Sequence, residues 1–255
     1  MKHIYHLWGI CLVAFPILAG CEEDLPVYSY SECGLKFSYT QDRDSVYNYS
    51  FAFAPSELNL QEDTVKVEVA LVGDVADYDR PISLQQIPSG TKDAVAGTHY
   101  VPFDDPSLAS LYVLPKNAIS TVIPIVVKRD ASLKTDDYKL KFTFKTNENF
   151  SFTLKERGAY SVVIADQLIK PNNWDRYCNH FFGSYSKVKH QLLIDATGFR
   201  WDNDFVDNRV KYYMGKDQNV LTGWQKKAQL ALDEYQAEHG EPLRDENGDI
   251  VTMGF

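Results

Sequence analysis

Near the N-terminus, Cys21 is the residue best placed for a chemical step, because it follows an apolar segment and two small residues. The segment from Leu7 to Leu18 is apolar apart from one glycine and is shorter than the roughly 20 apolar residues that a membrane-spanning helix needs. Small side chains at Ala19 and Gly20 suit cleavage by a signal peptidase, after which the Cys21 thiol can carry a diacylglyceryl group. We therefore predict that residues 1–20 are removed and that Cys21 becomes a lipidated N-terminus. An ordinary secretory signal with a chance cysteine is the alternative.

No catalytic constellation emerges from the remaining sequence. There is no Gly-x-Ser-x-Gly, no His-Glu-x-x-His, no phosphate loop and no dinucleotide fingerprint. Glycoside hydrolysis needs two carboxylates in one cleft, but with 35 acidic residues no pair stands out. We expect a protein that is not an enzyme and that needs no cofactor.

Aromatic residues concentrate in the C-terminal third and are the candidates for contact with a ligand or partner. Flat rings stack on sugar faces and anchor protein interfaces. The residues chosen as contacts are Trp174, Tyr177, Trp201 and Tyr212. Trp201, between Arg200 and Asp202, is the one expected to be exposed. Interior packing is the alternative for each ring.

Composition and cysteines restrict the class of protein further. The chain of 255 residues has a net charge of −9, which argues against nucleic acid and anionic membrane as binding surfaces. Once the signal is removed and Cys21 is lipidated, only Cys33 and Cys178 remain as thiols. An oxidising compartment allows a disulfide between them, and two separately buried cysteines are the other interpretation.

Alternating apolar and polar residues over residues 33–166 predict an immunoglobulin-like antiparallel β-sandwich. The clearest strand is 64–72, in which Val65, Val67, Val69 and Leu71 share one face. Further strands are expected at 35–39, 49–53, 82–87, 121–128, 138–144, 152–154 and 160–164. Residues 21–32 precede the sandwich as a lipidated tether.

After Asp166 the pattern changes, and we assign residues 167–255 to a smaller α+β unit with one long helix. The helix is predicted over 221–239, where apolar residues recur at helical spacing and Gly240 can end it. The other expected elements are a short helical turn at 174–177, strands at 187–195 and 210–214, and a hairpin about Asn247-Gly248.

Part of the sandwich region resembles Calx-β repeats. The residues that carry this resemblance are Gly97-Thr98-His99-Tyr100, Val113-Leu114-Pro115-Lys116-Asn117, the strand 121–128, and Arg129-Asp130. Some Calx-β domains bind calcium, which needs six to eight converging oxygens. The candidate acids here are Asp104, Asp105, Asp130, Asp136 and Asp137, with solvated loop acids as the alternative and no metal assigned.

Nearly the whole mature chain resembles a family of Bacteroidetes surface lipoproteins, the domain of unknown function DUF4843. Matching segments are Cys21 with Glu22-Glu23-Asp24, Gly73 to Pro81, 97–100, Pro171-Asn172-Asn173-Trp174, 182–189, and Asp245-Glu246-Asn247-Gly248. The acidic run after Cys21 resembles a signal for export to the outer face of the outer membrane. The resemblance implies an accessory protein beside a SusC-like TonB-dependent transporter and a SusD-like lipoprotein, and it transfers no catalytic residue.

The sequence thus predicts an outer-membrane lipoprotein, facing the cell exterior, that binds a peptide or glycan for such an importer. It touches the membrane through its lipid alone and binds no nucleic acid. A structural or adhesive surface module is one alternative, and a hydrolase is a second.

Overall fold

The computed structural model describes residues 32–39, 46–53 and 60–254. Cys21, the signal segment and the tether as far as residue 31 lie outside the described residues. No helix in the described part of the chain is both long and apolar enough to cross a bilayer.

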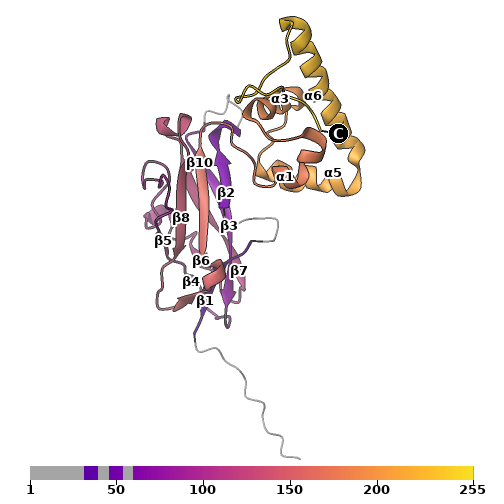
Figure 1. Ribbon diagram of the computed structural model, residues 1–255. Helices are drawn as coiled ribbons and strands as arrows, with labels where there is room; N and C mark the ends of the chain where they lie inside the picture. The colour runs from indigo at the N-terminus through magenta and orange to yellow at the C-terminus, as the bar shows by residue number, and fades with distance from the viewer. Residues whose placement is uncertain (1–31, 40–45, 54–59, 255) are drawn as a thin grey trace, which may run out of the picture.

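The predicted sandwich is confirmed as two four-stranded sheets, with a two-stranded ribbon at one end (Figure 1). One sheet has the order β7-β3-β1-β9, the other has the order β2-β10-β8-β5, and the ribbon is β4-β6. Pairing is antiparallel except between β1 and β9 and between β2 and β10. The strands are β1 (Gly34–Phe37), β2 (Val46–Ser50), β3 (Glu62–Val72), β4 (Arg80–Pro81), β5 (Leu84–Gln86), β6 (Val113–Leu114), β7 (Ser120–Lys128), β8 (Tyr138–Phe144), β9 (Phe152–Thr153) and β10 (Ala159–Ala165). Short 3-10 turns lie at Phe51–Phe53, Pro106–Leu108, Ala131–Lys134 and Lys155–Arg157.

Alternation along the strands forms the sandwich core. In β3 the side chains of Val65, Val67 and Val69 are buried, whereas those between them are exposed, as expected for a strand with one face on a core. Phe37 stacks on Phe144 across the core, with ring centroids 4.2 Å apart. The two apolar faces therefore meet between the sheets.

The C-terminal part is a separate, mainly helical unit with its own core. The predicted long helix is confirmed as α6, which begins three residues earlier than expected. The helices are α1 (Trp174–Tyr177), α2 (Asn179–Phe182), α3 (Lys187–Thr197), α4 (Asn203–Phe205), a π-helical turn (Val206–Val210), α5 (Lys211–Lys216) and α6 (Gln218–His239). The tail hairpin is confirmed by the bridge between Arg244 and Ile250, with Gly248 in a left-handed turn.

Two strand predictions in this unit are wrong. Residues 187–195 lie in helix α3, and 210–214 lie in the π-helical turn and α5. Capping accounts for α3, since the Ser186 side chain accepts a hydrogen bond from the Lys189 backbone N–H and Gly198 ends the helix with a left-handed φ of 75°. The unit is therefore more helical than the α+β description predicted, and the hairpin bridge is the only β pairing among its described residues.

Two asparagines join the helical unit to the free edge of β2. The Asn172 side chain donates to the Val46 carbonyl (2.7 Å) and accepts from the Asn48 N–H (2.9 Å). Asn203 donates to the Asn48 carbonyl and accepts from the Asn172 N–H. These side-chain amides form the hydrogen bonds that a neighbouring strand would otherwise make with β2. Separating the two units would break these bonds, and a buried backbone group left without a partner costs about 1–3 kcal/mol. The amides therefore fix one unit against the other.

An ion pair strengthens this junction directly after β10. The Arg129 guanidinium binds both carboxyl oxygens of Asp166, at 2.8 and 2.7 Å, and the Asp166 side chain is only 2% exposed. Bidentate pairs of this kind fix orientation as well as charge. The chain therefore leaves the sandwich in one direction, toward α1.

Candidate functional site

A cleft of about 400 Å³ lies between the sandwich and the helical unit. This volume is within the range of small-molecule sites. The sandwich contributes residues from β2, β3 and β10, and the helical unit contributes the segment 200–204. The residues that line it are Tyr47, Asn48, Tyr49, Phe53, Asp63, Thr64, Val65, Lys66, Tyr160, Arg200, Asp202, Asn203 and Asp204.

On the sandwich side, a tyrosine and an aspartate hold each other in place. The Tyr49 hydroxyl donates to Asp63 Oδ2 at 2.7 Å, and the Thr64 N–H donates to Asp63 Oδ1 at 2.7 Å. Burial raises the pKa of Tyr49, and the hydrogen bond to Asp63 adds to the rise. Tyr49 therefore stays neutral, and Asp63 is fixed at the cleft wall.

On the helical side, Arg200 and Asp202 form a second fixed pair. Arg200 Nε lies 3.1 Å from Asp202 Oδ2 and donates to the Phe53 carbonyl at 2.8 Å. Asp202 also caps α4 by accepting from the Phe205 N–H at 2.8 Å. Burial raises the pKa of Asp202, although the Phe205 N–H and Arg200 oppose the rise. This wall thus holds a partly buried carboxylate beside an arginine whose side chain is 42% exposed.

The remaining polar groups make the cleft both acidic and basic. Burial raises the pKa of Tyr47, and Asp204 and Asp202 add to the rise, so its phenol is neutral and can donate. Asp204 and Lys66 are exposed at the cleft and carry opposite charges. A uniformly charged ligand would meet a like charge, whereas a polar ligand with both donors and acceptors finds partners for each.

Of the predicted aromatic contacts, three lie in the interior. Trp174 and Trp201 are fully buried and Tyr177 is 4% exposed, so the predicted exposure of Trp201 is wrong. Its indole N–H donates to Thr197 Oγ1 at 2.8 Å, and its ring lies among those of Phe182, Phe205 and Trp224. The prediction of exposure relied on the polar residues on either side of Trp201. In the structure, Trp201 has a left-handed φ of 51° and its side chain points into the interior. Tyr212, 58% exposed, is the one candidate ring at the surface.

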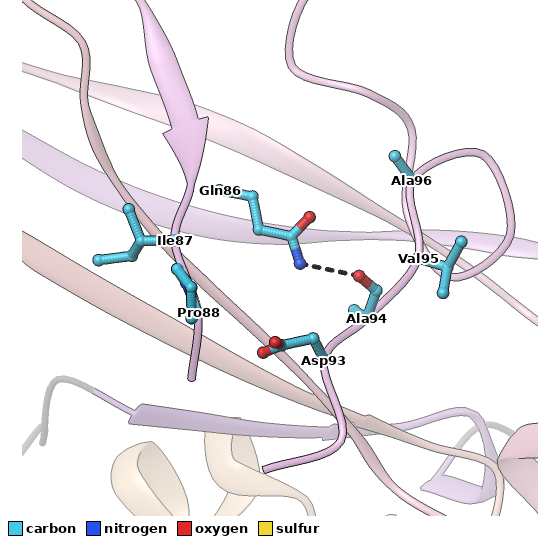
Figure 2. Close-up of a pocket in the computed structure, with 7 residues that line it drawn as sticks. All are labelled: Gln86, Ile87, Pro88, Asp93, Ala94, Val95 and Ala96. Carbon is cyan, nitrogen blue, oxygen red and sulfur yellow. Dashed lines mark hydrogen bonds between the residues drawn. The ribbon is translucent and has the colours of Figure 1, made fainter. Parts of the chain in front are cut away.

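A second hollow, of about 460 Å³, lies beside the edge strand β5 (Figure 2). Its one side-chain amide is already used: Gln86 Nε2 donates to the Ala94 carbonyl at 2.8 Å and Gln86 Oε1 accepts from Tyr100 at 2.8 Å. One oxygen of Asp93 accepts from the Ser89 N–H. Aliphatic groups form the rest of the lining, so this hollow offers a ligand far less polar chemistry than the cleft.

Three of the five acids considered for calcium have local partners in the structure, and the two cysteines are not bonded to each other. Asp105 and Asp130 each bind the N–H and hydroxyl of a serine two positions on, and Asp136 pairs with Lys92. Within the described ranges, no group of three or more metal-ligating side chains converges. Cys33 and Cys178 are both free, and burial raises the pKa of the Cys178 thiol.

Sequence reasoning missed the cleft residues because they come from segments more than a hundred positions apart. Tyr47 and Tyr49 alternate in a predicted strand, and Asp202 to Asp204 is a polar run. Neither pattern indicates that these two segments lie next to each other in the fold. Only the docking of the helical unit on β2 brings them together.

Comparison with known families and structures gives the following matches. A family model described as a domain of unknown function, DUF4843, matches residues 28–199. No curated protein matches the sequence. The apo-form Calx CBD1 domain has 17% identity and a TM-score of 0.34, with 54% of this chain and 99% of that chain covered.

Two Bacteroides proteins of unknown function also match. The two-domain protein from Bacteroides fragilis has 9% identity and a TM-score of 0.35, with 53% of this chain and 46% of that chain covered. The protein from Bacteroides ovatus has 11% identity and a TM-score of 0.36, with 51% of this chain and 43% of that chain covered. The match thus spans less than half the length of either Bacteroides protein.

Proposed function

The chain belongs to the DUF4843 family, and we propose that it is a lipid-anchored outer-membrane protein that captures a glycan or an oligopeptide for an importer of the SusC/SusD type. In this proposal Cys21 carries the lipid and the body faces the cell exterior. The ligand binds in the cleft between the two units. The protein delivers it to a TonB-dependent transporter and a SusD-like lipoprotein in the same membrane.

The observation that supports capture most directly is the place of the cleft in the fold. The described chain begins beside β1, whose Gly34 pairs with Val72 at the end of β3. Asp63, near the other end of β3, lines the cleft. Since Val72 and Asp63 are nine positions apart along this strand, they are separated by about 30 Å. A protein tethered through Cys21 would hold its cleft on the side away from the anchor, where a ligand from outside can enter.

Binding is favoured over hydrolysis by the state of the cleft carboxylates. Both oxygens of Asp63 accept hydrogen bonds within the sandwich. Asp202 caps a helix and pairs with Arg200. Glycoside hydrolysis needs two carboxylates, one as acid and the other as base or nucleophile. Asp63 and Asp202 are both held by other groups, and Asp204 by itself cannot supply the pair.

The anchor is tested by replacing the lipidated residue. We expect Cys21→Ala to accumulate as an unprocessed precursor without lipid, because the thiol is the only atom that can accept the diacylglyceryl group at this position. Metabolic labelling with a radioactive fatty acid and fractionation of membranes measure both effects. Normal cleavage together with firm membrane retention in the variant would contradict the lipoprotein assignment.

Ligand capture is tested with cleft variants of the full mature protein in detergent. We expect Tyr47→Ala and Asp204→Ala each to weaken binding of the ligand class by about tenfold, since each loses a hydrogen bond worth about 1–2 kcal/mol. Calorimetric titration with neutral oligosaccharides and, separately, with short peptides identifies the class. Leu230→Ala, at an exposed position on α6 that does not line the cleft, is the control. A cleaved ligand would instead favour the hydrolase alternative, and unchanged affinity in both variants would exclude the cleft.

A further inference from the structure

Three exposed apolar side chains lie on two neighbouring segments at the end of the sandwich opposite the cleft. Val75 and Tyr78 lie in the loop between β3 and β4, and Ile119 lies directly before β7. Their exposed fractions are 49%, 56% and 71%. We refer to Val75, Tyr78 and Ile119 as the apolar patch. Large apolar side chains grouped at a surface are typical of protein interaction sites.

Hydrogen bonds hold the two segments of the patch together. The Asn117 N–H donates to the Ala76 carbonyl at 2.7 Å, and the Lys116 N–H donates to Asp79 Oδ1 at 2.8 Å. The Leu71 N–H donates to the Ile119 carbonyl at 2.9 Å. The patch is therefore formed before any partner arrives, which limits the ordering cost of binding.

Three carboxylates and one lysine, Lys116, lie beside the patch, so its surroundings are acidic overall and restrict what can cover it. Asp74, Asp77 and Asp79 are all exposed on the same loop. Anionic lipid headgroups and a second copy of the same acidic patch would both be repelled. The complementary surface is a protein segment with apolar side chains inside a basic rim.

The start of the described chain places the patch near the proposed anchor. Cys33 Sγ lies 3.5 Å from the Asp74 carbonyl, so the first described residues of the chain lie beside this loop. Cys33 comes 12 positions after Cys21, a stretch that spans at most about 40 Å. If Cys21 is lipidated, the patch stays within that reach of the membrane, whereas the cleft lies at the far end of β3.

We propose that the apolar patch is the surface on which this protein docks to a membrane-embedded protein partner, through a basic and apolar extracellular segment of that partner. The inference rests on the proposed lipid anchor and importer function. Anchoring both proteins in one membrane raises their effective concentration, so a patch of this size suffices to hold them together. The cleft remains open to ligand while the opposite end is docked.

Site-specific photo-crosslinking in the native membrane tests the docking surface. A photoreactive amino acid replaces Ile119 in one strain and Leu230 in another. Leu230, 60% exposed on α6 in the helical unit, is the matched control. We expect a crosslink from position 119 to an integral membrane protein, identified by mass spectrometry, and none from position 230.

Charge variants measure the same contact without a probe. Ile119→Glu should reduce recovery of the membrane partner in mild detergent by at least about tenfold, because it places a carboxylate in the apolar centre of the contact, where removing its water is costly. Leu230→Glu should leave recovery unchanged. Both exposed sites should keep the wild-type unfolding temperature, and Ile119→Glu should keep the ligand affinity of the cleft.

The outcomes separate this inference from the proposed function. Full recovery of the partner with Ile119→Glu, or a crosslink from position 230 and not 119, overturns the docking surface and leaves the importer function standing. A crosslink from position 119 to another copy of the chain or to lipid also overturns it. Wild-type protein that comes down alone, without any crosslink, overturns both the docking surface and the importer function.

Discussion

Replacing Trp201 with alanine is expected to destabilise the helical unit by about 3–5 kcal/mol, the usual range for removing a large buried aromatic side chain. Trp201 is fully buried. Its ring centroid lies 4.8 Å from that of Phe182 and 5.1 Å from that of Phe205. A loss of this size is a large fraction of the total stability of most domains. The variant should therefore lose tertiary structure in the helical unit at temperatures where the wild type is folded.

Urea unfolding followed by tryptophan fluorescence measures this effect selectively. Apart from Trp8 in the signal segment, all tryptophans of the chain lie in the helical unit. Trp201→Phe should recover part of the loss because it keeps a ring in the same cavity. Tyr212→Ala, at a surface position, should change stability by no more than about 0.5 kcal/mol. If Trp201→Ala unfolds at the wild-type urea concentration, the interior position of this ring is wrong.

Acidification from pH 6.5 to pH 4 is expected to remove about 3 kcal/mol of stability through His190 alone. His190 is fully buried, and its ring lies near those of Phe53, Trp174 and Tyr185. Burial lowers its pKa from 6.5 to about 4, although the backbone of Arg200 and Trp201 favours the charged form.

The direction of the effect follows from where the proton binds. Between pH 6.5 and 4 the unfolded chain protonates this histidine, whereas the folded protein keeps it neutral. Protonation therefore stabilises the unfolded state, and the contribution of His190 is complete above pH 6.5 and lost as the pH falls toward 4. A difference of about 2.5 pKa units corresponds to roughly 3 kcal/mol.

The measurement compares the free energy of unfolding of wild type and His190→Gln across this pH range. The variant is expected to be less stable at neutral pH, but its stability should fall by about 3 kcal/mol less between pH 6.5 and pH 4. Gln191→Ala, an exposed change on the same helix, should keep the wild-type pH profile. Parallel profiles for wild type and His190→Gln would show that His190 does not remain neutral inside the fold.

The sequence by itself determined the sandwich and the long helix. Val65, Val67 and Val69 alternate with polar residues, and such a pattern buries one face only if the segment is a strand. Over 221–239 the apolar residues follow a helical period instead, and Gly240 supplies the left-handed residue that ends the helix. These features are local, so neighbouring residues suffice to specify them.

Two errors in the helical unit have different causes. Residues 187–195 have enough apolar residues for a strand, but Ser186 before them and Gly198 after them are local cap residues of a helix, and the prediction overlooked these signals. Trp201 has polar neighbours in sequence, yet a left-handed backbone turn directs its ring into the core. Local composition does not specify the direction of a side chain in an irregular loop.

The candidate site depended entirely on how the two units dock. Asn172 and Asn203 pair with the edge of β2 and thereby bring Arg200 and Asp202 opposite Tyr49 and Asp63. Each segment is ordinary by itself: a tyrosine-containing strand and a polar loop after a helix. The cleft exists because side-chain amides complete the hydrogen bonding of a strand edge, an interaction between distant segments that sequence periodicity does not encode.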